Sequence, residues 1–336
     1  MEIKEITNKK IWEEFISKYS PQSLFQSWNW GEVISKCIPT DQIWRIGLLN
    51  NNSLIGIALV CKVNAKRGKF LHLRHGPIFS SWNRKNLSFF FAYLKNLAYE
   101  NGCNFMRISP LISNTSENKT LHTVMRFRDA PIHALDGEYC WILDLDKDLN
   151  TIFSQMRKTT RYLVRQGEKK DIQIIQSIHK KDLDKFFDIY AKTAKRQNFV
   201  MHKGIREEFN IFSKDKQLIL FLGYCQKQLL AAALIIFYNH QAIYHHSASI
   251  EQKIPVNYLL QWEVIKEAKK RGMKSYNFWG IAPEDKPNHP WCGLTLFKKG
   301  FGGRTVEYLH CQDLPLNLLY YQTYLLEFVR RTWKGY

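Results

Sequence analysis

The same order of elements occurs twice along this 336-residue chain, and no other feature of the sequence constrains the fold as strongly. Each half contains helical sequence, an alternating apolar hairpin, a further strand, a helix that ends at a glycine, and a buried strand. These segments lie between residues 9 and 110 in the first half and between residues 180 and 283 in the second. The repeat therefore predicts two domains built to one plan.

Helices, an antiparallel meander, a helix and a final strand follow one another in the order of a GNAT-type domain. We therefore predict an α/β (α+β) fold of two tandem GNAT-like domains; a chance likeness between alternating elements is the alternative. A GNAT acetyltransferase holds the pyrophosphate of coenzyme A in a glycine-rich turn at a helix N-terminus. The corresponding junctions, FSSWNRKN (79–86) and SIEQKIPVN (249–257), lack that turn. Either the acyl group comes from another donor, or the chain is a binding module.

The chain carries a formal net charge of +19. A surplus of this size serves solubility, or it attracts a partner with many phosphates, such as RNA, a nucleotide-linked substrate or an anionic membrane surface. Arg157, Arg161 and Arg165 recur every four residues, which puts them on one face of a helix. This face either follows RNA phosphates or is simply solvated.

Cysteine and hydropathy patterns indicate a soluble protein of a reducing compartment. The seven cysteines are dispersed, with no CxxC pair and no zinc-type Cys/His spacing, so we expect no metal and no disulfide framework. The N-terminus, MEIKEITNKK, does not have the pattern of a signal peptide. The longest apolar run, 229–238, is half of the roughly 20 residues that a membrane span requires. We expect a cytoplasmic protein that can contact a membrane surface.

The eleven histidines show no metal-ligand spacing. His245 and His246 are neighbours in an alternating strand, so we expect them to point to opposite faces and not to line one pocket together. No Ser-His-Asp or Cys-His set stands out either.

Motifs between residues 25 and 316 resemble, in the correct order, the FemABX family of aminoacyl-tRNA-dependent peptidoglycan-bridge aminoacyltransferases. FQSWNWGEV is similar to the family's first motif, and SQMRKTTRYLVRQGEKKDIQI to the basic helix that opens its second domain. The remaining motifs are PVNYLLQWEVIKEAKKRGMKSYNFWGI and the segment that follows, APEDKPNHPWCGLTLFKKGFGGRTVEYLHCQDLPL.

This resemblance implies two GNAT-like domains that take an amino acid from aminoacyl-tRNA. They attach it to an amine on the stem peptide of a lipid-linked or UDP-linked peptidoglycan precursor. No Ser-His-Asp or Cys-His set is needed because the ester is already activated, and we expect no cofactor. The expected domains are 1–148, completed by a returning C-terminal segment 313–336, and 149–312. No charge-rich heptad run lies between residues 158 and 300, so the chain resembles the FemX-like type without a coiled-coil arm. We expect a monomer that makes transient contact with the inner face of the membrane.

The family's FK-x-x-F motif falls on Phe297 and Lys298, with Phe301 closing it. Aminolysis of an ester passes through a tetrahedral oxyanion, which a fixed cation stabilises. The resemblance assigns this work to Lys298, aimed into a cleft by the proline-rich loop 283–290, with Phe297 beside the terminal adenosine of the tRNA. On a strand-like segment Lys299 would face the other way. The alternative is that both lysines belong to a solvated hairpin turn.

The resemblance also implies residues that bind the acceptor substrate. Trp30 belongs to the first motif, Tyr244 and His246 lie where aromatic residues border the precursor, and Lys203 lies in the region of an arginine that holds the precursor's pyrophosphate. His246 is equally compatible with a hydrogen-bonded histidine of the core or surface.

Two positions depart from the family pattern. The place of a phosphate-contacting lysine is taken by Ile34, with Lys36 two residues further on, and the acidic residue of the R-x-D-P segment is Ser109. The acceptor therefore stays open. The alternatives are tRNA-dependent transfer to another amine or hydroxyl, such as a protein N-terminus or a lipid head group, and a catalytically silent tandem GNAT protein that binds RNA or nucleotides.

Overall fold

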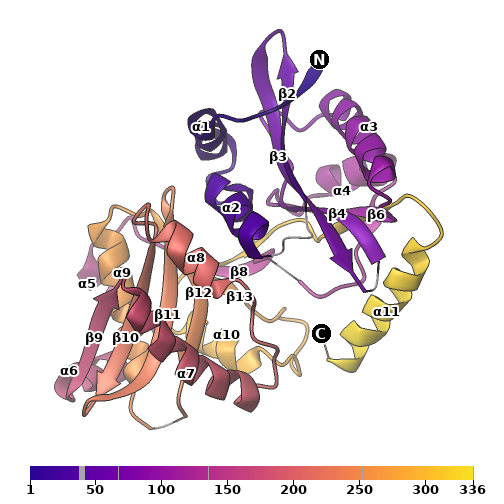
Figure 1. Cartoon of the computed structure of the whole chain (residues 1–336). Helices are drawn as coiled ribbons and strands as arrows, with labels where there is room; N and C mark the ends of the chain where they lie inside the picture. The colour runs from indigo at the N-terminus through magenta and orange to yellow at the C-terminus, as the bar shows by residue number, and fades with distance from the viewer. Residues whose placement is uncertain (38–41, 67, 135, 252, 336) are drawn as a thin grey trace. The chain divides into compact units, whose positions relative to one another are not determined.

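A computed structural model describes the chain except residues 38–41, 67, 135, 252 and 336. The chain divides into two compact units, each built around one mixed β-sheet (Figure 1). Unit 1 comprises Met1–Tyr139, Ala282–Pro290 and Val306–Tyr336, and unit 2 comprises Cys140–Ile281 and Trp291–Thr305.

The sheet of unit 1 is an antiparallel meander extended by a parallel strand. Its strand order is β1 (Glu2–Glu5), β2 (Ile43–Asn50), β3 (Ser53–Ala65), β4 (Gly68–His75), β6 (Phe105–Pro110), β15 (Gln312–Pro315) and β7 (Arg128–Asp129), and β5 (Ile78–Phe79) pairs with β3. The helices are α1 (Lys9–Tyr19), η1 (Leu24–Gln26), α2 (Trp28–Cys37), α3 (Arg84–Glu100), α4 (Ser116–Val124) and α11 (Tyr320–Trp333). The apolar face of α3 packs on this sheet, with Leu87, Phe90 and Leu94 in one core with β2, β3 and β4.

The sheet of unit 2 repeats this plan. Its strand order is β14 (Arg304–Glu307), β8 (Tyr139–Asp144), β13 (Ser275–Gly280), β12 (Gln241–Ser249), β11 (Gln228–Tyr238), β10 (Leu218–Cys225) and β9 (Ile172–Ser177). The helices are α5 (Leu149–Gln155), α6 (Lys158–Lys169), α7 (Lys180–Arg196), α8 (Ile205–Phe212), α9 (Val256–Lys270) and α10 (Cys292–Lys299). Helix α9 takes the place of α3: Leu260, Val264 and Ala268 pack into the core of the sheet.

Corresponding turns in the two units explain why the repeat could be recognised in the sequence. The hairpins β2–β3 and β10–β11 each turn through two residues with positive φ, Asn51 and Asn52 in the first and Gln226 and Lys227 in the second. Two such residues give a type I′ turn, whose twist matches that of the paired strands. In both units the meander is followed by a helix and a parallel strand, β6 beside β4 and β13 beside β12.

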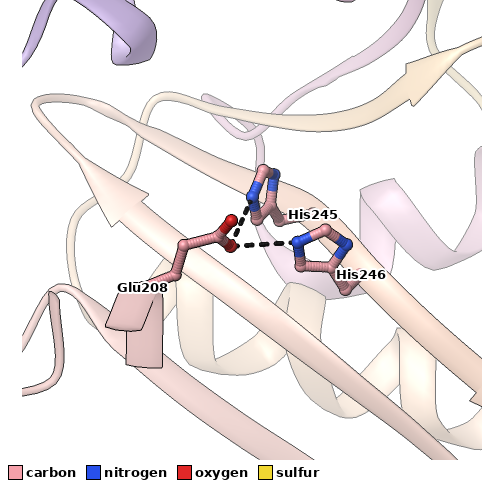
Figure 2. A group of neighbouring side chains, drawn as sticks. All are labelled: Glu208, His245 and His246. Atoms are coloured by element: carbon pink, nitrogen blue, oxygen red, sulfur yellow. Dashed lines mark hydrogen bonds and ion pairs between the residues drawn. The ribbon is translucent and has the colours of Figure 1, made fainter. Parts of the chain in front are cut away.

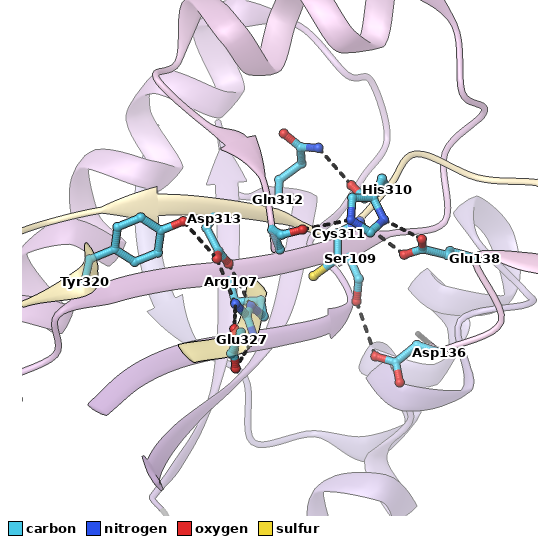
Figure 3. A network of polar contacts seen from close by, with 11 residues as sticks. Arg107, Ser109, Asp136, Glu138, His310, Cys311, Gln312, Asp313, Tyr320 and Glu327 are labelled. Carbon is cyan, nitrogen blue, oxygen red and sulfur yellow. Dashed lines mark hydrogen bonds and ion pairs between the residues drawn. The ribbon is translucent and has the colours of Figure 1, made fainter. Parts of the chain in front are cut away.

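A buried ionic network ties the C-terminal segment to the body of unit 1 (Figure 3). Arg107 on β6 donates to both carboxylate oxygens of Asp313 on β15 at 2.7 Å and to Glu327 on α11 at 2.7 Å. Tyr320 donates to Asp313 at 3.2 Å. Removing one partner of such a buried pair costs about 3–5 kcal/mol, so Arg107 fixes the returning strand and helix.

Candidate functional site

Lys298 lies in the last turn of α10, so its expected place on a strand-like segment was wrong. The residue is 3% exposed, and its Nζ donates to the carbonyl oxygen of Gly280 at 2.5 Å. Gly280 ends β13, the buried strand of the second repeat. The helix therefore aims Lys298 inward, while Lys299 is half-buried with its ammonium 5.3 Å from the ring centre of Trp141. A turn of 100° between helical neighbours separates the two lysines, rather than strand alternation.

Burial controls the charge of Lys298. Desolvation lowers the pKa of its ammonium from 10.5 to about 7, and the neighbouring Cys140 opposes this shift only in part. Burial also raises the pKa of the Cys140 thiol to about 12, so the thiol stays protonated at neutral pH. Lys298 is thus a cation poised near neutrality, and an approaching anion favours its charged form.

Aromatic rings fix the end of α10. Phe297 meets Tyr258 edge to face, with ring centres 5.1 Å apart, and Phe301 stacks on Phe278 at 5.4 Å. Phe301 is fully buried, whereas Phe297 is only half-buried. A half-buried ring beside a buried lysine can stack on a nucleobase.

The basic helix α6 begins beside the end of α10. The backbone N–H of Arg157 donates to the carbonyl oxygen of Gly300 at 2.9 Å. A Cβ on Gly300 would lie 2.5 Å from Oγ1 of Thr160, so only glycine allows this approach. The fold thereby brings the predicted RNA-binding face next to Lys298 within unit 2.

The three arginine side chains of that face differ in their exposure and in their contacts. Arg157 precedes α6 and is exposed, as is Arg165, whose guanidinium lies 5.3 Å from the ring centre of Phe153. Arg161 instead turns back and donates to the carbonyl oxygens of Ser154, at 2.7 Å, and Met156. Arg161 therefore caps the end of α5, and its replacement would disturb the fold as well as any RNA contact.

A cavity of about 580 Å³ opens where the meander meets α9. Its lining includes Leu163 of α6, Arg196, Lys253, Asn257 and Tyr258, whose ring contacts Phe297. This is the junction 249–257 that lacks the glycine-rich turn. The volume is within the roughly 300–1,000 Å³ of small-ligand sites. The N-terminus of α9, Arg196 and Lys253 favour an anionic occupant, although Glu251 also lies in the lining.

In unit 1, Trp30 is buried on α2, and Arg74 lies over it and over Phe25, with guanidinium-to-ring distances of 5.3 and 3.6 Å. Lys36 is exposed in the last turn of α2, and Ile34 is half-buried.

Asp136 is a candidate functional carboxylate that the sequence did not predict. It accepts two hydrogen bonds from Arg74, at 3.0 and 2.5 Å. Its carboxylate also lies 3.5 Å from Oγ of Ser109 (Figure 3). Burial would raise the pKa of this carboxyl, but Arg74 lowers it to about 2. An ionised carboxylate thus stands next to the position where the family's acidic residue is replaced by serine. No sequence motif could have revealed it, because Asp136 is 27 residues from Ser109.

His245 and His246 point the same way, and the expectation that they face opposite sides of the sheet was wrong. The pairing of β12 with β11 shifts between Leu234 and Ile235, which are opposite His246 and Tyr244, so His245 is the extra residue of a β-bulge. A bulge places two residues against one and re-aims their side chains. The Nε2 atoms of both imidazoles lie against one oxygen of Glu208, at 3.0 and 2.9 Å (Figure 2).

The other predicted acceptor residues are spread over unit 2. Lys203 is exposed just before α8, and Tyr244 packs against the core from β12, where burial raises the pKa of its phenol. Across the described ranges, no helix is long and apolar enough to cross a membrane.

The model of the FemAB family matches residues 7–131, 133–220 and 220–327. The chain belongs to the FemAB family. A FemAB match over three segments agrees with the resemblance drawn from the motifs, and it makes the chain an aminoacyltransferase.

Relatives of this FemAB protein include the aminoacyltransferase FemA of Staphylococcus aureus, which is 20% identical over 82% of this chain and 86% of FemA. The crystal structure of FemX has a TM-score of 0.83 at 17% identity and covers 97% of this chain and 100% of that one. A tandem GNAT protein from the clavulanic acid biosynthesis pathway has a TM-score of 0.54 at 9% identity, covering 85% of this chain and 94% of its own. The predicted fold of two tandem GNAT-like domains is therefore confirmed.

Proposed function

We propose that this FemAB protein transfers an amino acid from aminoacyl-tRNA to an amine on the stem peptide of a peptidoglycan precursor. The observation that carries the proposal is Lys298, a buried lysine with a pKa near 7 beside a half-buried aromatic ring and a basic helix. FemA, a relative by sequence, is named an aminoacyltransferase.

The proposed reaction needs one positive charge to stabilise the tetrahedral oxyanion when it forms. The acceptor amine attacks the ester carbonyl carbon, and a tetrahedral oxyanion forms. The intermediate then expels the ribose oxygen of the tRNA, which takes the proton that the amine loses. Lys298 stabilises the oxyanion as its ammonium form, which the phosphates of the bound tRNA favour by their negative charge.

The aminoacyl-tRNA donor is recognised by residues of unit 2. Arg157 and Arg165 bind tRNA phosphates, together with the exposed lysines of α6. Phe297 stacks on the terminal adenosine, and the cavity at the start of α9 receives the acceptor end of the tRNA. Arg161 contributes charge but has a capping role as well.

The residues that we propose to bind the acceptor substrate are Trp30, Lys36, Lys203, Tyr244 and His246. Asp136 supplies the carboxylate that Ser109 lacks, since the two side chains are 3.5 Å apart.

The departure at Ile34 favours one alternative, transfer to another amine or hydroxyl. The same Lys298 chemistry serves either acceptor, so the nature of the acceptor is decided by experiment.

We also propose a cytoplasmic protein that acts at the membrane surface through α11 and the two residues before it. Apolar side chains there are 53–84% exposed, namely Leu318, Leu319, Leu325, Leu326, Val329 and Trp333. The last turn of the helix carries Arg330 and Arg331, and its one carboxylate, Glu327, is buried against Arg107. Exposed apolar side chains with a positive end match an anionic lipid surface, where a lipid-linked acceptor would lie.

The direct test incubates the pure protein with labelled aminoacyl-tRNAs and with UDP-linked or lipid-linked precursors. The proposal predicts label in the precursor. Label in another amine or hydroxyl compound selects the alternative acceptor, and tRNA binding without transfer to any acceptor selects a silent binding protein.

A further inference from the structure

We propose that Glu208, His245 and His246 form a binding site for a divalent transition-metal cation such as Zn²⁺. The site lies in unit 2 and shares His246 with the residues proposed to bind the acceptor, but a cation can bind there whether or not the protein transfers amino acids. Glu208 comes from α8, and the two histidines come from the bulge of β12 (Figure 2).

The three side chains converge on one point. Their ligand atoms, two imidazole nitrogens and one carboxylate oxygen, all lie within 4.8 Å of one another. Both imidazoles approach the same oxygen, Oε2 of Glu208, although a carboxylate offers two oxygens to separate donors. The side chains are buried, at 6% exposure for Glu208, 6% for His245 and 9% for His246.

The distances match a cation with little movement. Zinc binds imidazole nitrogen and carboxylate oxygen at about 2.0–2.2 Å, so two tetrahedral ligands are about 3.3 Å apart. The nitrogen–oxygen distances here are 3.0 and 2.9 Å, so these two pairs need to separate by only a few tenths of an ångström, and the two imidazole nitrogens lie within 4.8 Å of each other. In the metal-free cluster each Nε2 that donates to Glu208 carries the ring's proton. When a cation binds at Nε2, that proton moves to Nδ1 of the same ring, so that each imidazole ligates in its neutral form.

The donor set selects the class of metal. Imidazole suits Zn²⁺, Cu²⁺, Fe²⁺ and Ni²⁺, whereas Mg²⁺ and Ca²⁺ prefer oxygen ligands only. Two imidazoles and one carboxylate leave a fourth tetrahedral position open to water or a substrate atom.

The β-bulge at His245 explains why both imidazoles reach the same oxygen of Glu208. In a regular strand His245 and His246 would lie on opposite faces, and a single imidazole would reach Glu208. The extra residue at the bulge brings the second imidazole to the same oxygen. Bulges of this kind occur next to functional sites, where they re-aim a side chain.

The test uses the full chain, without a histidine tag and freed of metal by a chelator. Zn²⁺ is titrated by calorimetry and Co²⁺ by visible absorption. We expect one saturable equivalent, with Co²⁺ bands typical of four-coordinate nitrogen and oxygen ligands. Glu208→Gln and His246→Gln should each weaken binding by at least about tenfold. His240→Ala removes an exposed histidine outside the cluster and should leave the affinity unchanged.

Absence of saturable binding in the wild-type chain would overturn the proposal, as would equal affinities of the folded Glu208→Gln and His240→Ala variants. If both cluster variants fail to fold, the Co²⁺ spectrum of the wild-type chain decides alone. A spectrum of hexaaqua Co²⁺ then rejects the site, and four-coordinate bands support it. Neither outcome bears on whether the protein transfers amino acids.

Discussion

Replacing Lys298 with methionine should stabilise the fold at neutral pH while it removes the proposed catalytic cation. A pKa lowered from 10.5 to about 7 means that burial disfavours the ammonium. At about 1.4 kcal/mol per pKa unit, this disfavours the charged form by about 5 kcal/mol relative to the unfolded chain. Methionine fills a similar volume without charge but leaves the Gly280 carbonyl without its donor, which costs about 1–3 kcal/mol. The net expectation is a gain of about 2–4 kcal/mol below pH 7.

The sign of the pH dependence follows from proton counting. Between pH 7 and pH 10.5 the unfolded chain holds a proton on Lys298 that the folded chain has lost, so wild-type stability rises with pH through this window. The methionine variant has no such group. Its advantage should therefore shrink by about 2–3 kcal/mol between pH 6 and pH 9.

Urea unfolding of both proteins at several pH values measures this difference, with Lys299→Met as the matched control. Lys299 is only half-buried, with its ammonium over the ring of Trp141, so Lys299→Met should not gain the stability expected from the removal of a buried charge. A Lys298→Met variant that is less stable than the wild type at pH 6, or a gap that stays constant to pH 9, would refute the reasoning about burial.

The remaining predictions concern ligands and surfaces. Calorimetry with coenzyme A should show no binding at sub-millimolar concentration, since neither junction has the pyrophosphate turn; a cofactor held at either junction would contradict this. Affinity for tRNA should fall steeply with salt, and Arg165→Glu should weaken it without loss of fold, whereas a salt-independent affinity would remove electrostatics from the account. Vesicles that contain anionic lipid should sediment the wild-type protein but less of a Leu326→Ser, Trp333→Ser variant, and equal sedimentation would rule out α11 as the contact.

The fold could be predicted from the repeat because the sequence features that define its helices, strands and turns are local. Turn residues such as Asn51 and Asn52, glycines at helix ends and apolar periodicity all act within a few positions. The C-terminal contribution to the first sheet was suggested only by the family resemblance. The pair that holds it, Arg107 with Asp313, spans 206 residues.

The candidate site was predictable only in part. The FK-x-x-F motif pointed to Lys298, but the helical form of 292–299 was not predicted, because Pro283, Pro287 and Pro290 just before it favour a loop. The bulge at His245 depends on how β12 pairs with β11, and this pairing cannot be predicted from the alternation of residues along one strand. Asp136 beside Ser109 and Glu208 beside two histidines are likewise products of tertiary structure.

The measurement that tests the central claim most directly is the rate of amino-acid transfer by Lys298→Met, Lys298→Arg and Lys299→Met. Loss of one oxyanion stabiliser lowers the rate by about a hundred- to a thousandfold, which is the loss we expect for Lys298→Met. Lys298→Arg should also be impaired, because a planar guanidinium does not fit a pocket shaped for a compact ammonium, and Lys299→Met should lose much less. Transfer at near wild-type rates by both methionine variants would contradict the account and leave the FK-x-x-F lysine without a catalytic role.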